Sequence, residues 1–193
     1  MKPDPVTIGR TMLIQRAAEL MKKYSIRHLP VVDGSRLEGF ITQTDLRQYF
    51  FPSMVEDIHV HDVMAVNPIT IDVDSSIDKA ARMIHDHKIG GLPVMEGDRL
   101  VGVITSSDII AGFIEVMGLL QSSTRLDVIV DMDGGVEDVT RIIKENEIEI
   151  FSVAAEIRNS SPKVYYFRLG KGHIEPVVKA LESAGHRVIS IMD

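Results

Sequence analysis

Cysteine is absent from this chain of 193 residues. Disulfides and thiolate metal sites are therefore excluded, and a reducing cytoplasm is the simplest location for the protein. Long apolar runs are absent too: no stretch of about eighteen apolar residues occurs, so we expect no membrane span. Because no apolar segment follows Lys2, the N-terminus does not have the pattern of a signal peptide.

Basic residues are in the minority. The chain has 21 Lys and Arg against 28 Asp and Glu, which gives a net charge of −7. Affinity for nucleic acids depends mostly on the neutralisation of phosphates by basic side chains, so we expect no nucleic-acid partner. Walker-type loops, Gly-x-Gly-x-x-Gly motifs and nucleophile–base arrangements do not stand out either, and we expect no catalytic activity.

What the sequence does contain is an internal repeat. Residues 5–46 align without a gap on residues 68–109, with 17 identities in 42 positions. Two similar copies predict one structural unit that buries its apolar face against its twin. We expect the ligand sites of such a unit in the cleft between the copies.

Each copy has the same pattern, β-α-β-β-α. A helix with apolar residues at helical spacing follows a short strand, and a tight turn joins the next two strands as a hairpin before a second helix. The proline of Leu-Pro-Val predicts an edge strand or a first strand position. A lead-in helix is expected at Val55–Met64. The expected elements are strand 6–8, a helix around 14–21, strands 29–32 and 37–42 and helix 45–50, and in the second copy strand 69–71, a helix around 77–84, strands 92–95 and 100–105 and helix 108–120.

The pattern changes after residue 120, at a predicted junction over 121–124. An alternating strand, a glycine-containing turn, an amphipathic helix, two strands, a second helix that stops at Gly185 and a closing strand follow. This order is β-α-β-β-α-β, the ferredoxin-like split pattern, and it makes the whole chain an α+β protein. The expected segments are strand 125–131, turn 131–135, a helix around 136–143, strands 148–157 and 163–169 joined by 158–162, a helix around 174–181 and strand 186–192.

Three motifs carry a family resemblance. Pro-x-Thr-Ile, Leu-Pro-Val and Gly-h-h-Thr-x-x-Asp, in which h is apolar, occur in register in both copies. The repeats resemble cystathionine-β-synthase (CBS) domains, and the pair over 5–112 resembles a Bateman module. The C-terminal part resembles an ACT domain, and the order of the three is similar to the acetoin-utilisation AcuB family. The resemblance implies a first CBS domain over 1–60, a second over 61–121 and an ACT-like domain over 124–193.

A threonine and an aspartate stand where the last strand of each copy passes into a helix. The first turn of a helix exposes unpaired N–H groups that favour phosphate, a hydroxyl there can bind a phosphate oxygen, and a carboxylate can accept both hydrogens of a ribose diol. The resemblance assigns the ribose and phosphate to Thr42 and Asp45, and to Thr105 and Asp108. Thr-x-x-Asp is also close to a capping box, in which the two side chains satisfy the helix themselves.

The resemblance also implies the walls of an adenine slot and a phosphate end. The first strands and the prolines form the slot, unless these residues are simply sheet core. Basic residues before Leu29 meet phosphate, unless they are solvated surface, whereas glycines before Leu92 offer only backbone and space. The residues concerned are Thr7, Ile8, Pro30, Thr70, Ile71 and Pro93 for the slot, Arg27 and His28 for phosphate, and Gly91 in the second copy.

Two further features are weak. The pairs His59–His61 and His85–His87 have a spacing that diverges on a helix, and no third ligand is evident, so we expect no metal site. ACT relatives often bind small amino acids at a turn like 131–135, although a glycine-permitted turn capped by Asp133 explains the same residues.

These observations predict a regulatory protein that has no catalytic activity and no cofactor. Its ligand is an adenine nucleotide (AMP, ADP or ATP) or S-adenosylmethionine, bound in the cleft of the CBS pair. A homodimer is expected, since both domain types expose pairing surfaces, and the protein that it regulates is unknown. The alternative is a non-binding dimerisation or assembly module that regulates a partner enzyme.

Overall fold

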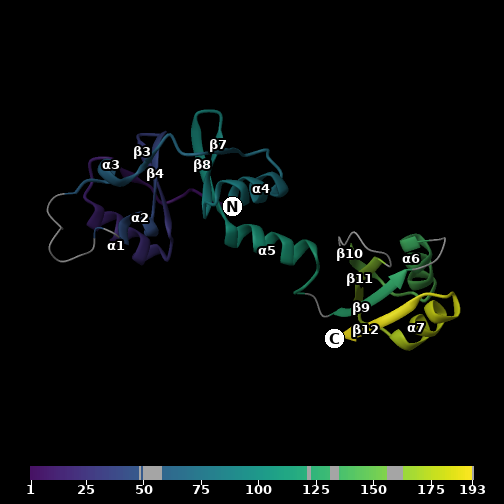
Figure 1. The fold of residues 1–193 in the computed structure, drawn as a ribbon. Helices are drawn as coiled ribbons and strands as arrows, with labels where there is room; N and C mark the ends of the chain where they lie inside the picture. The colour runs from purple at the N-terminus through teal and green to yellow at the C-terminus, as the bar shows by residue number, and fades with distance from the viewer. Residues whose placement is uncertain (48, 50–57, 121–122, 131–134, 156–162, 193) are drawn as a thin grey trace. The chain divides into compact units, whose positions relative to one another are not determined.

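The computed structural model describes residues 1–47, 49, 58–120, 123–130, 135–155 and 163–192 (Figure 1). The chain divides into two compact units, Met1–Ile110 and Ala111–Asp193. Several predicted features lie outside the described residues: the junction at 121–122, most of the turn at 131–135, and the connection 158–162. In the described part of the chain, no helix combines the length and the apolar composition that a membrane crossing requires.

The first unit contains the two copies, and the predicted β-α-β-β-α order is confirmed in each. The first strand of each copy begins at the last residue of the predicted range, 6–8 or 69–71. Pairing with the neighbouring strand starts only there, where Ile8 pairs with Val31 and Ile71 with Val94. The first copy consists of β2 (Ile8–Gly9), α1 (Ile14–Tyr24), β3 (His28–Asp33), β4 (Arg36–Thr42) and α2 (Gln43–Arg47). The second consists of β6 (Ile71–Asp72), α4 (Ile77–His87), β7 (Gly91–Glu96), β8 (Arg99–Thr105) and α5 (Ser106–Val116).

The two copies share one sheet with the order β2-β3-β4-β8-β7-β6. The order reads as one copy followed by its inverted twin, and the halves pair at Arg36 and Arg99. Each copy has a helix-covered core of its own, in which α1 or α4 packs on the two long strands. The duplication seen in the sequence is therefore a structural pseudo-symmetry.

The segment that leads into each copy crosses to the other copy. Strand β5 (Ala65–Val66) precedes the second copy but pairs with β4 of the first, and β1 (Lys2–Pro3) precedes the first copy but pairs with β8 of the second. The expected lead-in helix at Val55–Met64 is shorter in the described residues, where α3 spans Val60–Val63. No pattern in the sequence indicates this exchange.

Two glycines permit this exchange. A Cβ atom on Gly39 would lie 2.5 Å from Sδ of Met64 and 3.0 Å from the carbonyl oxygen of Ala65. A Cβ on Gly102 would lie 2.9 Å from Sδ of Met1 and 3.0 Å from the carbonyl oxygen of Lys2. The glycine of the repeated motif is needed for the close approach of the crossing segment.

The prolines of Leu-Pro-Val are buried at the third position of β3 and β7, not at a first strand position or in an edge strand. Pro30 lies opposite Phe40 of β4, and on its other side β2 pairs only with Val31 and Val32. The flank of Pro30 therefore needs no N–H donor, which is why an internal strand tolerates the proline.

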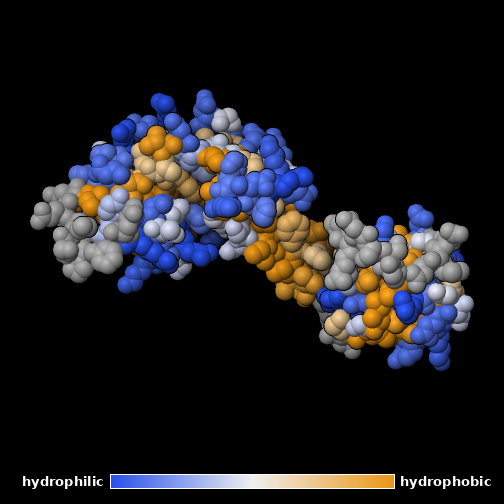
Figure 2. Space-filling view, viewed as in Figure 1, coloured by the Kyte–Doolittle hydropathy of each residue, from blue (hydrophilic) through white to orange (hydrophobic). Residues whose placement is uncertain are grey.

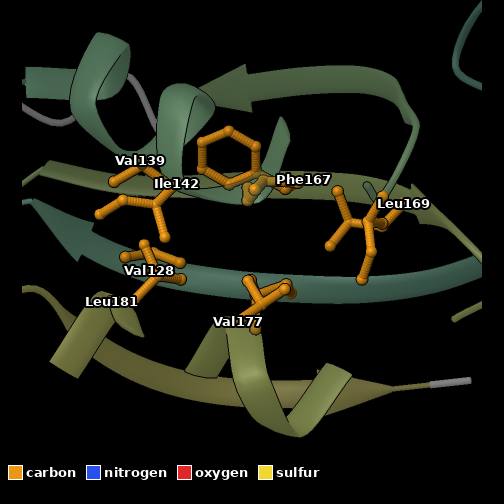
Figure 3. Close-up of a cluster of buried hydrophobic side chains, with 10 residues drawn as sticks. Val128, Val139, Ile142, Phe167, Leu169, Val177 and Leu181 are labelled. Atoms are coloured by element: carbon orange, nitrogen blue, oxygen red, sulfur yellow. The ribbon is translucent and has the colours of Figure 1, made fainter. Parts of the chain in front are cut away.

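The second unit confirms the β-α-β-β-α-β order. Its strands form an antiparallel sheet with the order β10-β11-β9-β12, and side chains of both helices and of the strands form one buried core (Figure 3). Gly185 has a φ of +90° just after the end of the last helix, as its predicted role as a stop requires. The elements are β9 (Ser123–Val130), α6 (Gly135–Glu145), β10 (Ile150–Ala155), β11 (Lys163–Gly170), α7 (Ile174–Ser183) and β12 (Arg187–Met192).

Helix α5 carries an apolar surface, visible in Figure 2. Ile110, Phe113 and Val116 are 58%, 38% and 73% exposed. Contiguous apolar exposure of this kind marks a surface for association.

Candidate functional site

A cleft with a volume of about 750 Å³ opens in the first unit beside helix α2. This size is in the range of about 300–1,000 Å³ that is typical of small-molecule sites. Its walls come from both copies. They consist of Arg27, His28, Phe40, 42–45 and Arg47 of the first copy, the crossing segment 65–69, and 88–91 and Ser106 of the second copy.

Asp45 lies in this cleft and is tied to Thr42 by reciprocal bonds. The backbone N–H and the hydroxyl of Thr42 both donate to Oδ2 of Asp45, at 2.8 and 2.7 Å, and the N–H of Asp45 donates to Oγ1 of Thr42 at 3.3 Å. The capping interpretation of Thr-x-x-Asp is thus realised. It does not use up the carboxylate, because Oδ1 of Asp45 has no hydrogen-bond partner among the described residues.

The second copy reproduces the same geometry. The N–H and hydroxyl of Thr105 donate to Oδ2 of Asp108 at 2.8 and 2.6 Å, and the N–H of Asp108 lies 3.4 Å from Oγ1 of Thr105. Neither residue lines the 750 Å³ cleft. The two carboxylates therefore differ in surroundings and not in local bonding.

The cleft is predominantly basic. Arg27, Arg47 and Lys88 line it, whereas Asp45 is the one acidic residue among the described lining residues. A concave surface with an excess of positive charge concentrates anions. The cleft therefore favours a ligand that carries phosphate and still offers a carboxylate oxygen for a hydroxyl donor.

His28 stands where the two copies meet. Its ring stacks on Phe40 with centroids 5.9 Å apart. A Cβ on Gly90 would lie 2.6 Å from Nε2 of His28, so the ring occupies space that a side chain at this position would fill. Burial lowers the pKa of His28 below its ordinary value of 6.5, Arg27 lowers it further, and Asp45 opposes the change.

This pKa shift predicts a pH dependence of stability. Between the folded-state pKa and 6.5 the unfolded chain binds more protons at residue 28 than the folded chain, so the free energy of unfolding falls as the pH drops through this range. We expect His28→Gln to flatten this part of the profile. Urea denaturation of both proteins between pH 5 and 8 measures the difference, and parallel profiles would contradict the prediction.

The structure brings some of the predicted site residues together and leaves others elsewhere. Arg27, His28, Thr42, Asp45 and Gly91 line one cleft. Ile8 and Ile71 are buried in the two cores, as are Pro30 and Pro93 in their strands. Thr7, Thr70, Thr105 and Asp108 also lie outside this cleft.

Sequence reasoning missed part of the lining. The wall of the first copy's cleft is the segment 65–69 that leads into the second copy, and not the strand at Thr7 and Ile8. Phe40 and Arg47 were missed as well, because their positions are ordinary ones for a strand and a short helix. In the alignment of the two copies, residues 65–69 match residues 2–6. The alignment does not show that each of these segments crosses to the other copy.

The histidine pairs do not form a metal site in the described residues. The rings of His59 and His61 stack with centroids 5.4 Å apart, and Nε2 of His61 lies 3.3 Å from Asp62. Within the described ranges, no three His, Cys, Asp or Glu residues are grouped as metal ligands would be.

The first unit is therefore a module of two β-α-β-β-α repeats that are related by pseudo-symmetry and have a cleft between them. The CBS domain family matches residues 1–51 and 60–115, more than half of the chain. The chain therefore belongs to the CBS domain family, which confirms the resemblance of the repeats. The match ends at residue 115, and the ACT-like identity of the C-terminal unit stays a prediction.

Individual proteins agree with this family. A CBS domain-containing protein of Dictyostelium discoideum is 36% identical over 124 residues, which cover 58% of this chain and 86% of the relative. A structure from Vibrio cholerae, described as an acetoin utilization protein (AcuB), is 33% identical with a TM-score of 0.56 and covers 64% of this chain and 93% of its own.

A third relative carries a ligand. The CBS domain pair of protein MJ0100, in complex with 5-methylthioadenosine and S-adenosyl-L-methionine, is 33% identical with a TM-score of 0.52. The likeness covers 58% of this chain and 93% of that pair. The enzymes among the first curated relatives are matched over only about a fifth of their own length.

Proposed function

We propose that this chain is a cytoplasmic regulatory protein, without catalytic activity, that binds an adenosine-containing ligand in the cleft of the first unit. The observation that carries the proposal is Asp45, whose Oδ2 caps α2 while Oδ1 stays available in a cleft of about 750 Å³. The methylthioadenosine and S-adenosylmethionine bound by the MJ0100 pair support it.

The charges in the cleft narrow the choice among adenosine ligands. A ribose hydroxyl can donate to Oδ1 of Asp45, and phosphates fit the guanidinium and ammonium groups of Arg27, Arg47 and Lys88. S-adenosylmethionine places a positive sulfonium where a nucleotide has phosphate. AMP, ADP and ATP are therefore the favoured ligands for this cleft.

Binding has a route to regulation, because the cleft is formed by both copies. Lys88 and Gly91 belong to the second copy, and Arg27 and Asp45 to the first. A ligand that contacts both copies stabilises one arrangement of the pair, and its effect is limited by its difference in affinity between arrangements. A role in acetoin utilisation belongs to the same proposal and rests on the likeness to the Vibrio cholerae protein.

A thermal-shift comparison of AMP, ADP, ATP and S-adenosylmethionine tests the proposal. A ligand at about one hundred times its dissociation constant stabilises the folded protein by about 2.7 kcal/mol, which raises Tm by several degrees. We expect larger shifts for the phosphorylated nucleotides than for S-adenosylmethionine. The absence of a shift with all four ligands would refute the proposal.

The alternative is an assembly module that binds no ligand and regulates a partner enzyme as a homodimer. The capping bonds of Asp45 and Asp108 need no ligand, and the exposed Phe113 and Val116 of α5 provide an apolar surface for self-association. A dimer in sedimentation experiments, combined with no thermal shift, would favour this alternative.

A further inference from the structure

The second unit contains a cavity of about 350 Å³ on the face of its sheet that the helices leave open. Leu126, Phe167 and Leu169 are fully buried in the helix-covered core. Because side chains alternate along a strand, Arg125, Tyr166 and Arg168 project from the opposite face. All three line the cavity.

The cavity places two arginines side by side. Arg125 of β9 and Arg168 of β11 are direct cross-strand partners. Like charges in this position destabilise an antiparallel pair. Asp127 compensates one of them, since Nε and Nη2 of Arg125 donate to its two carboxylate oxygens at 2.7 and 3.0 Å. The guanidinium of Arg125 also lies 4.6 Å from the ring centroid of Tyr166.

Arg168 has no such compensation. Its Nη1 donates to the hydroxyl of Ser123 at 3.3 Å, and within the described ranges it pairs with no carboxylate. The face therefore has two guanidinium groups and one carboxylate at its centre. A guanidinium presents a planar set of donors that matches a carboxylate in a bidentate pair.

Part of the lining of the cavity is apolar. Met117 and Leu119, which follow helix α5, line it together with Ala154 of β10. The hydroxyl of Ser152 donates to the carbonyl oxygen of Met117 at 2.9 Å and so fastens this segment to the sheet. The cavity thus combines an uncompensated cation with an apolar wall.

We propose that this cavity binds a small organic carboxylate with a short apolar body. The carboxylate pairs with Arg168, and the apolar body packs against Met117 and Leu119. The binding adds the negative charge that the cross-strand arginine pair lacks. This site is built wholly within the second unit, and it is independent of the function proposed for the cleft of the first unit.

Amide chemical shifts of the full-length protein test the proposal, with hexanoate as the probe and hexylamine and 1-hexanol as matched controls. We expect hexanoate to shift the amides of Ser152, Tyr166 and Arg168 in a saturable manner, and neither control to do so. Arg168→Met should weaken hexanoate binding at least tenfold. Lys171→Met removes one exposed positive charge outside the cavity and should leave the affinity within twofold.

A third variant acts in the opposite direction. Asp127→Asn releases Arg125 from its partner and should tighten hexanoate binding severalfold. A loss of stability alone would not tighten binding. The proposal is overturned if hexanoate causes no saturable shift in the wild-type protein, or if Arg168→Met binds it equally well. It is also overturned if the same amides shift with protein concentration alone, since the face would then be an interface between copies of the chain.

Discussion

Asp45→Asn is expected to weaken AMP binding by at least about tenfold, because a hydrogen bond to a charged group contributes about 1.5–3 kcal/mol. The substitution keeps the size of the side chain but leaves one acceptor oxygen in place of two. The donors of Thr42 require that oxygen for the cap, so an NH2 group that cannot accept from a ribose hydroxyl takes the place of Oδ1. Titration calorimetry with AMP measures the change. The same substitution also weakens the cap of α2, so a loss of stability is expected beside the loss of affinity.

Asp108→Asn is the matched control for this loss of stability. The bonds between Thr105 and Asp108 repeat those between Thr42 and Asp45 to within 0.1 Å, at 2.8 against 2.8 Å, 2.6 against 2.7 Å and 3.4 against 3.3 Å. Both variants should lose roughly 1 kcal/mol of stability, the typical cost of an N-cap. Only Asp45→Asn should lose affinity, since Asp108 does not line the cleft. Unchanged AMP binding in both variants would leave capping as the role of both aspartates.

The fold was predictable from the sequence to the extent that its signals are local. The repeat of 5–46 at 68–109 predicted a duplicated β-α-β-β-α unit, and alternation and helical spacing predicted the split β-α-β-β-α-β order of the second. The predictions that were wrong concern the pairing of strands that are distant in the sequence. Pro30 has the pattern of an edge residue, yet it lies in an internal strand. The sheet tolerates the proline there because β2 is too short to pair with it.

The candidate site was predictable in the same measure. Thr42 and Asp45, and likewise Arg27 and His28, stand in short local motifs, and the structure gathers all four in one cleft. The segment 65–69 was assigned to the second copy, because nothing in a linear pattern reveals that it crosses to the first. Asymmetry between the copies was visible as His28 against Gly91, and the structure explains it: the histidine ring fills the space at Gly90 and Gly91.

Gly39→Val is expected to remove AMP binding almost completely and to lower the free energy of unfolding by about 1–3 kcal/mol, the usual cost of overpacking. The first carbon of the new side chain would already meet Sδ of Met64 at 2.5 Å and the carbonyl oxygen of Ala65 at 3.0 Å. A methionine side chain can move aside, but the carbonyl belongs to the backbone of β5. The crossing segment must therefore shift, and with it residues 65–69, which form a wall of the cleft.

Gly102→Val separates the loss of this wall from a general loss of stability. Its side chain would meet Sδ of Met1 at 2.9 Å and the carbonyl oxygen of Lys2 at 3.0 Å, so the steric conflict is similar. The displaced segment is then the one at Met1 and Lys2, and not residues 65–69. Urea denaturation should show comparable destabilisation of the two variants, and calorimetry should show AMP binding retained only in Gly102→Val. Equal loss of AMP binding in both would mean that the exchange of segments acts on the cleft through the stability of the whole pair, and that 65–69 is not a wall with a role of its own.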